Sequence, residues 1–305
     1  MFDRIAPLAA PLVTVQVPSA ASSIMHPTVV LVEYCIALIC SISTIILLYC
    51  IYRFKSLRVL WKDSQPLALL FVSISLISVL SALFNIQWIL LILQVFPNDA
   101  QYSLIIFSSA FASTAVHLFY ISATLGVFAQ RIYVIMYPLK PIHTVSKAVV
   151  CIVIGITLIA VGNLSLAINS PTTIAPLPEG CYSLNCSTFL SKRNYSILTV
   201  LTLSTVTVVL GTTFQFVYYR YKKQHHSAKS MNRFVCYTFI IRLVCETIPF
   251  FVDILLTMTI GLYIGPYGAF GLTIDFFTCT FTYYLIVVKK KGVTVKLTSV
   301  QSTTH

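Results

Sequence analysis

Four residues in one apolar stretch, Phe234–Thr259, have side chains that could do chemistry inside a membrane. Arg242, Glu246, Pro249 and Asp253 follow one another at spacings of four, three and four residues. At about 100° per residue, these spacings place all four on one face of a helix. Ionisable side chains within an apolar segment usually face the protein interior. The pattern therefore predicts an inward stripe in which Arg242 and Glu246, four residues apart, form an ion pair.

Pro249 gives this stretch a predicted point of bending. Proline has no N–H to donate within a helix, so it removes one backbone hydrogen bond and kinks the chain. We expect a hinge between the inner and outer halves of the helix. The alternative is that the ion pair only holds helices together and that the kink is static.

Three acids are expected in the outer halves of apolar stretches: Asp253, Asp275 and Glu33. One interpretation is an acidic pocket, open to the outside, that binds a cationic or hydrogen-bonding ligand. The alternative is that burial keeps the carboxyls protonated and hydrogen-bonded to neighbouring helices.

The elements that must position these residues follow from the composition. The chain has 305 residues, of which 58% are apolar and 9% charged, whereas about 25% of the residues in a soluble domain are charged. Folding leaves much of the surface of a soluble protein exposed, so a chain this apolar cannot be one. This excludes soluble enzymes, disordered proteins and nucleic-acid-binding domains.

Seven stretches reach the length of about 20 apolar residues that a membrane-spanning helix needs. They are Val29–Tyr52, Leu67–Trp88, Tyr102–Phe128, Ala148–Ile168, Tyr195–Tyr218, Phe234–Thr259 and Tyr267–Val288. The sequence therefore predicts an all-helical integral membrane protein. An outer segment (1–28) is followed by a seven-helix bundle (29–288) and a short basic tail (289–305).

Lysine and arginine set the predicted orientation. Sixteen of the 20 lie in the connections after the first, third and fifth stretches and in the tail. Three lie on the other side, and Arg242 lies inside a span. Because cytoplasmic loops are enriched in Lys and Arg, this split predicts a cytoplasmic C-terminus and an extracellular N-terminus.

The longest connection, Asn169–Asn194, is expected outside the cell. It contains two cysteines, Cys181 and Cys186, and the glycosylation sequons of Asn185 and Asn194. The cysteines are five positions apart, and an oxidising compartment favours a local disulfide. The alternative is two free thiols, because an intervening turn must first bring them together. The other seven cysteines lie in apolar runs and are expected to be small buried hydrophobes.

A short motif at the inner end of the third stretch resembles a known receptor box. Gln130-Arg131-Ile132-Tyr133, followed by Pro138, is similar to the Asp-Arg-Tyr box of rhodopsin-type G-protein-coupled receptors, with glutamine in place of the acid. The run Gln130–Lys140, the Cys181…Cys186 loop and the Lys289–Lys291 run are similar to nematode serpentine chemoreceptors, with class beta-C (Srbc) the nearest.

The resemblance implies roles for named residues. Arg131, Tyr133 and Pro138 would couple to a heterotrimeric G protein, and Arg242, Glu246 and Pro249 would act in the switch. It further implies a chemosensory neuron, with the receptor in the plasma membrane of the sensory cilium. The alternative for Arg131 is one more positive charge at an inner helix end.

Several departures from the rhodopsin pattern favour a divergent chemoreceptor over an amine or peptide receptor. The second stretch has no aspartate, and no cysteine lies near Asn98–Tyr102 to tether the second outer loop. The last stretch has neither an Asn-Pro pair nor a lysine, so a retinal Schiff base is excluded.

The sequence fits three other functions less well than it fits a receptor. An intramembrane enzyme needs grouped catalytic side chains, and His117 is the only histidine inside a span, so neither an enzyme nor a metal site nor a cofactor is expected. A transporter usually shows internal repeats, and a seven-span ligand-gated cation channel of the insect odorant-receptor kind has its N-terminus inside. The expected function is a G-protein-coupled receptor for a small extracellular molecule, with lipid and G protein as partners, no nucleic acid, and a homo- or hetero-oligomer as an open possibility.

Overall fold

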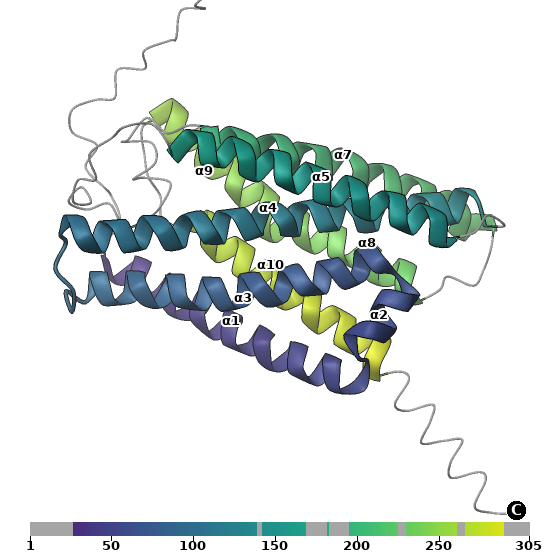
Figure 1. The fold of residues 1–305 in the computed structure, drawn as a ribbon, viewed down its shortest axis with the longest axis horizontal. Helices are drawn as coiled ribbons and strands as arrows, with labels where there is room; N and C mark the ends of the chain where they lie inside the picture. Colours follow the sequence, from purple (N-terminus) through teal and green to yellow (C-terminus); the bar gives the residue numbers. More distant parts are fainter. Residues whose placement is uncertain are drawn as a thin grey trace, which may run out of the picture.

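The computed structural model describes residues 27–138, 142–168, 182, 195–224, 230–260 and 266–289. Every element in these residues is helical. Their bounds are α1 Pro27–Phe54, α2 Leu57–Asp63, α3 Gln65–Ile92, α4 Ala100–Met136, α5 Ile142–Ile168, α7 Tyr195–Gln224, α8 Ser230–Arg242, η1 Leu243–Thr247, α9 Ile248–Ile260, α10 Tyr267–Tyr283 and η2 Tyr284–Lys289. The helices form one elongated bundle (Figure 1).

Six helices are long and apolar enough to cross a membrane: α1, α3, α4, α5, α7 and α10. Their outward faces carry large exposed apolar side chains such as Ile39, Leu158 and Val209. Surfaces of this kind are stable against lipid and unstable against water. The protein is a multi-pass membrane helical bundle, as the composition predicts.

The sixth predicted stretch differs from the others in its internal geometry. It is helical from Ser230 to Ile260, but in three successive pieces, α8, η1 and α9, of which η1 is a turn of π-helix. No single piece reaches spanning length. The turn ends two residues before Pro249, which has no N–H to donate to the carbonyl of Cys245 four residues earlier. π-bulges of this kind are frequent at functional sites.

Local signals explain where several helices begin. Ser64 separates α2 from α3, and Pro66 occupies the first turn of α3, where a proline N–H would have no helical partner. The Asp99 carboxylate accepts a hydrogen bond from the Tyr102 N–H at 2.7 Å and so caps α4.

The helix arrangement places α4 and α10 at the centre. α4 packs against α3, α5 and α7, whereas α1 packs against α3 and α10. α10 also contacts α8 and η1. In Figure 1, α10 and α8 run between the α1–α3 side and the α5–α7 side of the bundle. Side chains of α10 and of the α8–η1–α9 segment therefore meet those of α4 inside the protein.

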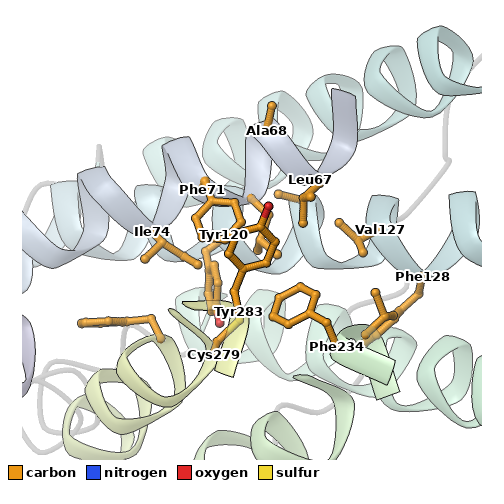
Figure 2. Close-up of a cluster of buried hydrophobic side chains, with 14 of the residues drawn as sticks. Leu67, Ala68, Phe71, Ile74, Tyr120, Val127, Phe128, Phe234, Cys279 and Tyr283 are labelled. Atoms are coloured by element: carbon orange, nitrogen blue, oxygen red, sulfur yellow. The ribbon is translucent and has the colours of Figure 1, made fainter. Parts of the chain in front are cut away.

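An aromatic core fixes these central contacts. Tyr283 packs edge-on against Phe71 and Phe234, with ring centroids 4.6 and 5.2 Å away. Phe128 lies 6.0 Å from Phe214, across the α4–α7 contact. Figure 2 shows side chains of α3, α4, α8 and α10 meeting in this core. The core holds the inner parts of α8 and α10 in register.

Candidate functional site

The inward stripe of the sixth segment begins with the ion pair predicted from the four-residue spacing. Arg242 Nη2 lies 3.0 Å from Glu246 Oε2 and donates a hydrogen bond to Oε1 at 3.3 Å. Arg242 is 2% exposed and Glu246 is 4% exposed. A pair this deeply buried needs further partners, because the desolvation of both charges outweighs a single contact.

The α4 helix supplies those partners. His117 Nε2 lies 2.7 Å from Glu246 Oε1. Arg242 Nη1 donates to Thr124 Oγ1 at 2.5 Å, and the guanidinium carbon lies 4.5 Å from the centre of the Tyr120 ring. The last contact has the geometry of a cation–π interaction. α4 thus binds both members of the pair.

The α10 helix joins the same cluster through Asp275. The Tyr120 hydroxyl donates a hydrogen bond to Asp275 Oδ2 at 2.8 Å, and Asp275 is fully buried. We call Arg242, Glu246, His117, Tyr120 and Asp275 the polar core. It links α4, the α8–η1 junction and α10.

Charge balance in the polar core depends on a proton. Arg242 neutralises one carboxylate, so the second carboxyl must carry a proton, or His117 must, for the cluster to be neutral. Apart from the ion-pair contact of Glu246 Oε2 with Arg242 Nη2, neither Glu246 Oε2 nor Asp275 Oδ1 has a hydrogen-bond partner among the described residues. Asp275 is fully buried and accepts a hydrogen bond from Tyr120, and its role in ligand binding stays a prediction.

A close helix contact holds the π-turn in place. A methyl group built on Gly271 of α10 would lie 2.1 Å from the backbone oxygen of Cys245 and 3.7 Å from Cα of Glu246. Only a glycine lets α10 approach this backbone. The Cys245 carbonyl is the one that Pro249 leaves without its usual helical donor, so Gly271 and Pro249 act on the same turn.

The other predicted pocket acids lie elsewhere. Asp253 is buried on α9, seven residues beyond Glu246, which is about 10 Å along the helix. Glu33 is partly buried on α1, and its Oε2 atom has no hydrogen-bond partner among the described residues. Pro249 is also partly buried. A ligand role for these acids stays a prediction.

Near the C-terminal end of α4, Gln130 joins three segments. Its Oε1 accepts a hydrogen bond from Ser64 Oγ at 2.5 Å, and its Nε2 donates to Ser146 Oγ at 3.1 Å. Ser64 lies between α2 and α3, and Ser146 lies on α5. We call Ser64, Gln130 and Ser146 the inner latch. The glutamine that replaces the acid of the receptor box therefore bonds to neighbouring helices.

The other residues of the receptor-box motif lie directly after Gln130 in the chain. Arg131 is partly buried, and its Nε has no hydrogen-bond partner among the described residues. The Tyr133 ring lies 5.0 Å from that of Tyr137, and the exposed Pro138 follows the end of α4. The coupling role of these residues stays a prediction.

The predicted disulfide and glycosylation sites, Cys181, Cys186, Asn185 and Asn194, lie outside the described residues. In this connection only Tyr182 is described. Its carbonyl accepts a hydrogen bond from the Tyr34 hydroxyl at 2.9 Å.

Sequence reasoning missed three members of this site: Tyr120, Thr124 and the pairing role of His117. A usable signal existed, because residues 117, 120 and 124 lie on one face of a helix. Their partners lie more than 100 residues away in the chain. Across the part of the chain that the structure describes, no group of three or more His, Cys, Asp or Glu side chains could hold a metal ion.

Comparison with known proteins yields no relative. No protein-family model matches the chain, and no curated protein matches it. Any functional assignment therefore depends on the arrangement of helices and on the geometry of the polar core and the inner latch.

Proposed function

We propose that the chain is a seven-span G-protein-coupled receptor of the chemosensory kind, with its N-terminus outside the cell and its C-terminus in the cytoplasm. In this proposal α8, η1 and α9 together form the sixth span in chain order, which brings the six long apolar helices to a total of seven spans. The receptor would bind a small extracellular molecule and activate a heterotrimeric G protein, in the plasma membrane and in a sensory cilium.

The polar core at the π-turn carries the proposal. Ionisable groups inside a membrane bundle are costly and are typically functional. Here they join three helices at the point where the Ser230–Ile260 segment changes from π- to α-helix and where Pro249 weakens its backbone bonding. A packed polar cluster of this kind has discrete arrangements, which is what a two-state switch requires.

The proposed mechanism follows from that location. A ligand bound between the outer halves of the helices stabilises one arrangement of α9, and it shifts the equilibrium by its differential affinity for the two states. The segment then pivots near Pro249, and α8 moves relative to α4. Arg131 and the inner connections become accessible to the G protein.

The inner latch supports a resting state without the usual acid. Gln130 holds the α2–α3 junction and α5 against α4. A neutral hydrogen bond contributes about 1 kcal/mol. Loss of one or both bonds would shift the resting equilibrium roughly five- to thirtyfold toward the active state.

The test uses this latch, so it needs no known ligand. Gln130→Ala should raise basal guanine-nucleotide exchange roughly fivefold in membranes that contain the receptor and a G protein. Arg131→Ala introduced into the Gln130→Ala background should return exchange to the level of membranes without receptor. An N-terminal tag should be stained in intact cells, and a C-terminal tag only after permeabilisation.

Ser73→Ala serves as a matched control, because Ser73 is buried on α3 and bonds only within its own helix. It should leave basal exchange unchanged. Full exchange by the surface-delivered Arg131→Ala double variant would remove the coupling role of Arg131. A C-terminal tag stained in intact cells would reject the orientation, and ligand-gated currents would then be measured.

A further inference from the structure

Four buried polar atoms at the end of the bundle formed by the α3–α4 turn have no hydrogen-bond partner among the described residues. They are Nδ2 and Oδ1 of Asn85, Nε1 of Trp88 and Oγ of Ser103. None of these three side chains is more than 1% exposed. A buried donor or acceptor without a partner destabilises a protein, so a cluster of them calls for an explanation.

Ser103 differs from other buried hydroxyls of the bundle. Ser41, Ser73 and Ser78 each donate to a backbone carbonyl three or four residues earlier in their helix. This is the usual way for a serine in a helix to satisfy its hydroxyl. Ser103 makes no such bond among the described residues, which leaves its hydroxyl available to another partner.

The three side chains lie on facing surfaces of α3 and α4. Asn85 and Trp88 are three residues apart and so are neighbours on one face of α3. Ser103 is three and seven residues before Ile106 and Ala110, which pack with Trp88 in one buried cluster. α3 and α4 are antiparallel neighbours in close contact (Figure 1). The four polar atoms without partners therefore lie on the facing surfaces of α3 and α4.

Aromatic rings pack against Trp88, one of the three side chains. The Tyr34 ring of α1 lies parallel to Trp88 with a centroid distance of 5.8 Å, and Phe84 packs edge-on against Trp88 at 6.1 Å. Tyr182 packs against the same cluster, and its carbonyl accepts a hydrogen bond from the Tyr34 hydroxyl. Apolar and aromatic walls with a few convergent polar groups are the usual composition of a small-molecule site.

We propose that Asn85, Trp88 and Ser103 form a binding site for a small uncharged molecule that carries both a hydrogen-bond donor and an acceptor, such as a primary amide. The indole N–H and the Asn85 amide donate to the ligand, and the Asn85 carbonyl accepts from it. The Ser103 hydroxyl serves in either role. The chemistry of this site specifies the ligand class of the receptor proposed above. The binding site depends on that proposed function only for its biological role.

The test measures the thermal unfolding of the full-length protein in lipid nanodiscs, with butanamide as the probe. Butanamide should raise the melting temperature of the native protein in a saturable manner, because a ligand that binds only the folded state stabilises it. N,N-dimethylbutanamide, which lacks the donor, should give little or no shift. Asn85→Leu should abolish the shift and, without probe, should raise the melting temperature by about 2 °C or more, since an unpaired buried amide has been removed.

Trp88 supplies a readout at the site itself. The chain has two tryptophans, Trp61 and Trp88, so Trp61→Phe leaves Trp88 as the only indole. Its emission should shift on addition of butanamide, and Ser103→Ala should weaken the shift severalfold. Ser73→Ala, which removes an equally buried but bonded hydroxyl, should not.

Three results would overturn the proposal. The first is a lower melting temperature for Asn85→Leu without probe, which would show that the polar groups are satisfied by structural water. The second is equal stabilisation of the native and variant proteins by butanamide, and the third is no saturable stabilisation at all. None of these readouts uses a G protein, so a failure of the receptor function in nucleotide exchange is distinguishable from a failure of this site.

Discussion

Glu246→Ala should lower the melting temperature of the purified protein by on the order of 10 °C, because it leaves a buried arginine without its counter-ion. Removal of one partner of a buried ion pair costs about 3–5 kcal/mol. Arg242 keeps its contacts with Thr124 and the Tyr120 ring, but neither carries a negative charge. His117 also loses the carboxylate at 2.7 Å. Glu246→Gln, which retains an acceptor, should be intermediate in thermal unfolding.

Two comparisons isolate the buried charge as the cause. Replacement of both partners, Arg242→Leu with Glu246→Leu, should recover most of the lost stability, since apolar pairs often substitute for buried ion pairs without loss. The Lys55–Asp63 pair is the matched control, because half of the Asp63 side chain is exposed (52%) at a separation of 2.5 Å. Asp63→Asn should cost less than about 1 kcal/mol. Equal losses of stability for Asp63→Asn and Glu246→Ala would mean that water reaches the polar core and screens its ion pair.

Gly271→Ala should destabilise the protein by about 1–3 kcal/mol. The added methyl carbon would lie 2.1 Å from the Cys245 oxygen. A backbone atom cannot rotate away as a side chain can, so α10 and the π-turn must separate. Separation would also pull Glu246 away from His117 on α4. The combined loss of stability should be measured by thermal unfolding of the purified protein.

Gly155→Ala is the matched control for this substitution. Gly155 also lies within a spanning helix, α5, and a methyl group built on it has no neighbour within 4 Å. Both substitutions improve helix propensity by about 1 kcal/mol, so their difference reports the clash alone. A Gly271→Ala protein as stable as the Gly155→Ala protein would show that α10 does not press against the π-turn.

The apolar stretches predicted the helices closely, because length and hydrophobicity are local properties of the chain. The stretch Val29–Tyr52 lies within α1, and Leu67–Trp88 within α3. The third stretch extends further than expected, since α4 continues from Ala100 through Arg131 to Met136. A π-turn lies just before Pro249, where the sequence predicts a hinge. This backbone detail depends on what packs against the turn, and the hinge itself stays a prediction.

The candidate site was predicted only in part. The four-residue spacing of Arg242 and Glu246 on one helix was enough to predict their ion pair, and the burial of Asp253 followed from the same stripe. The sequence placed Asp275 in the outer half of its span but did not predict that it accepts a hydrogen bond from Tyr120 in the polar core. Depth estimated by counting residues does not reveal which neighbouring helix covers a side chain.

The sequence by itself determined that this is a helical membrane protein with an inward ionisable stripe, because these features depend on composition and on periodicity within one segment. Only the tertiary structure decided that His117 meets Glu246, that Gln130 links two helices and that Gly271 touches the Cys245 carbonyl. Each of these contacts joins residues on different helices. Their formation depends on the rotation and vertical register of whole helices, and no local pattern encodes either.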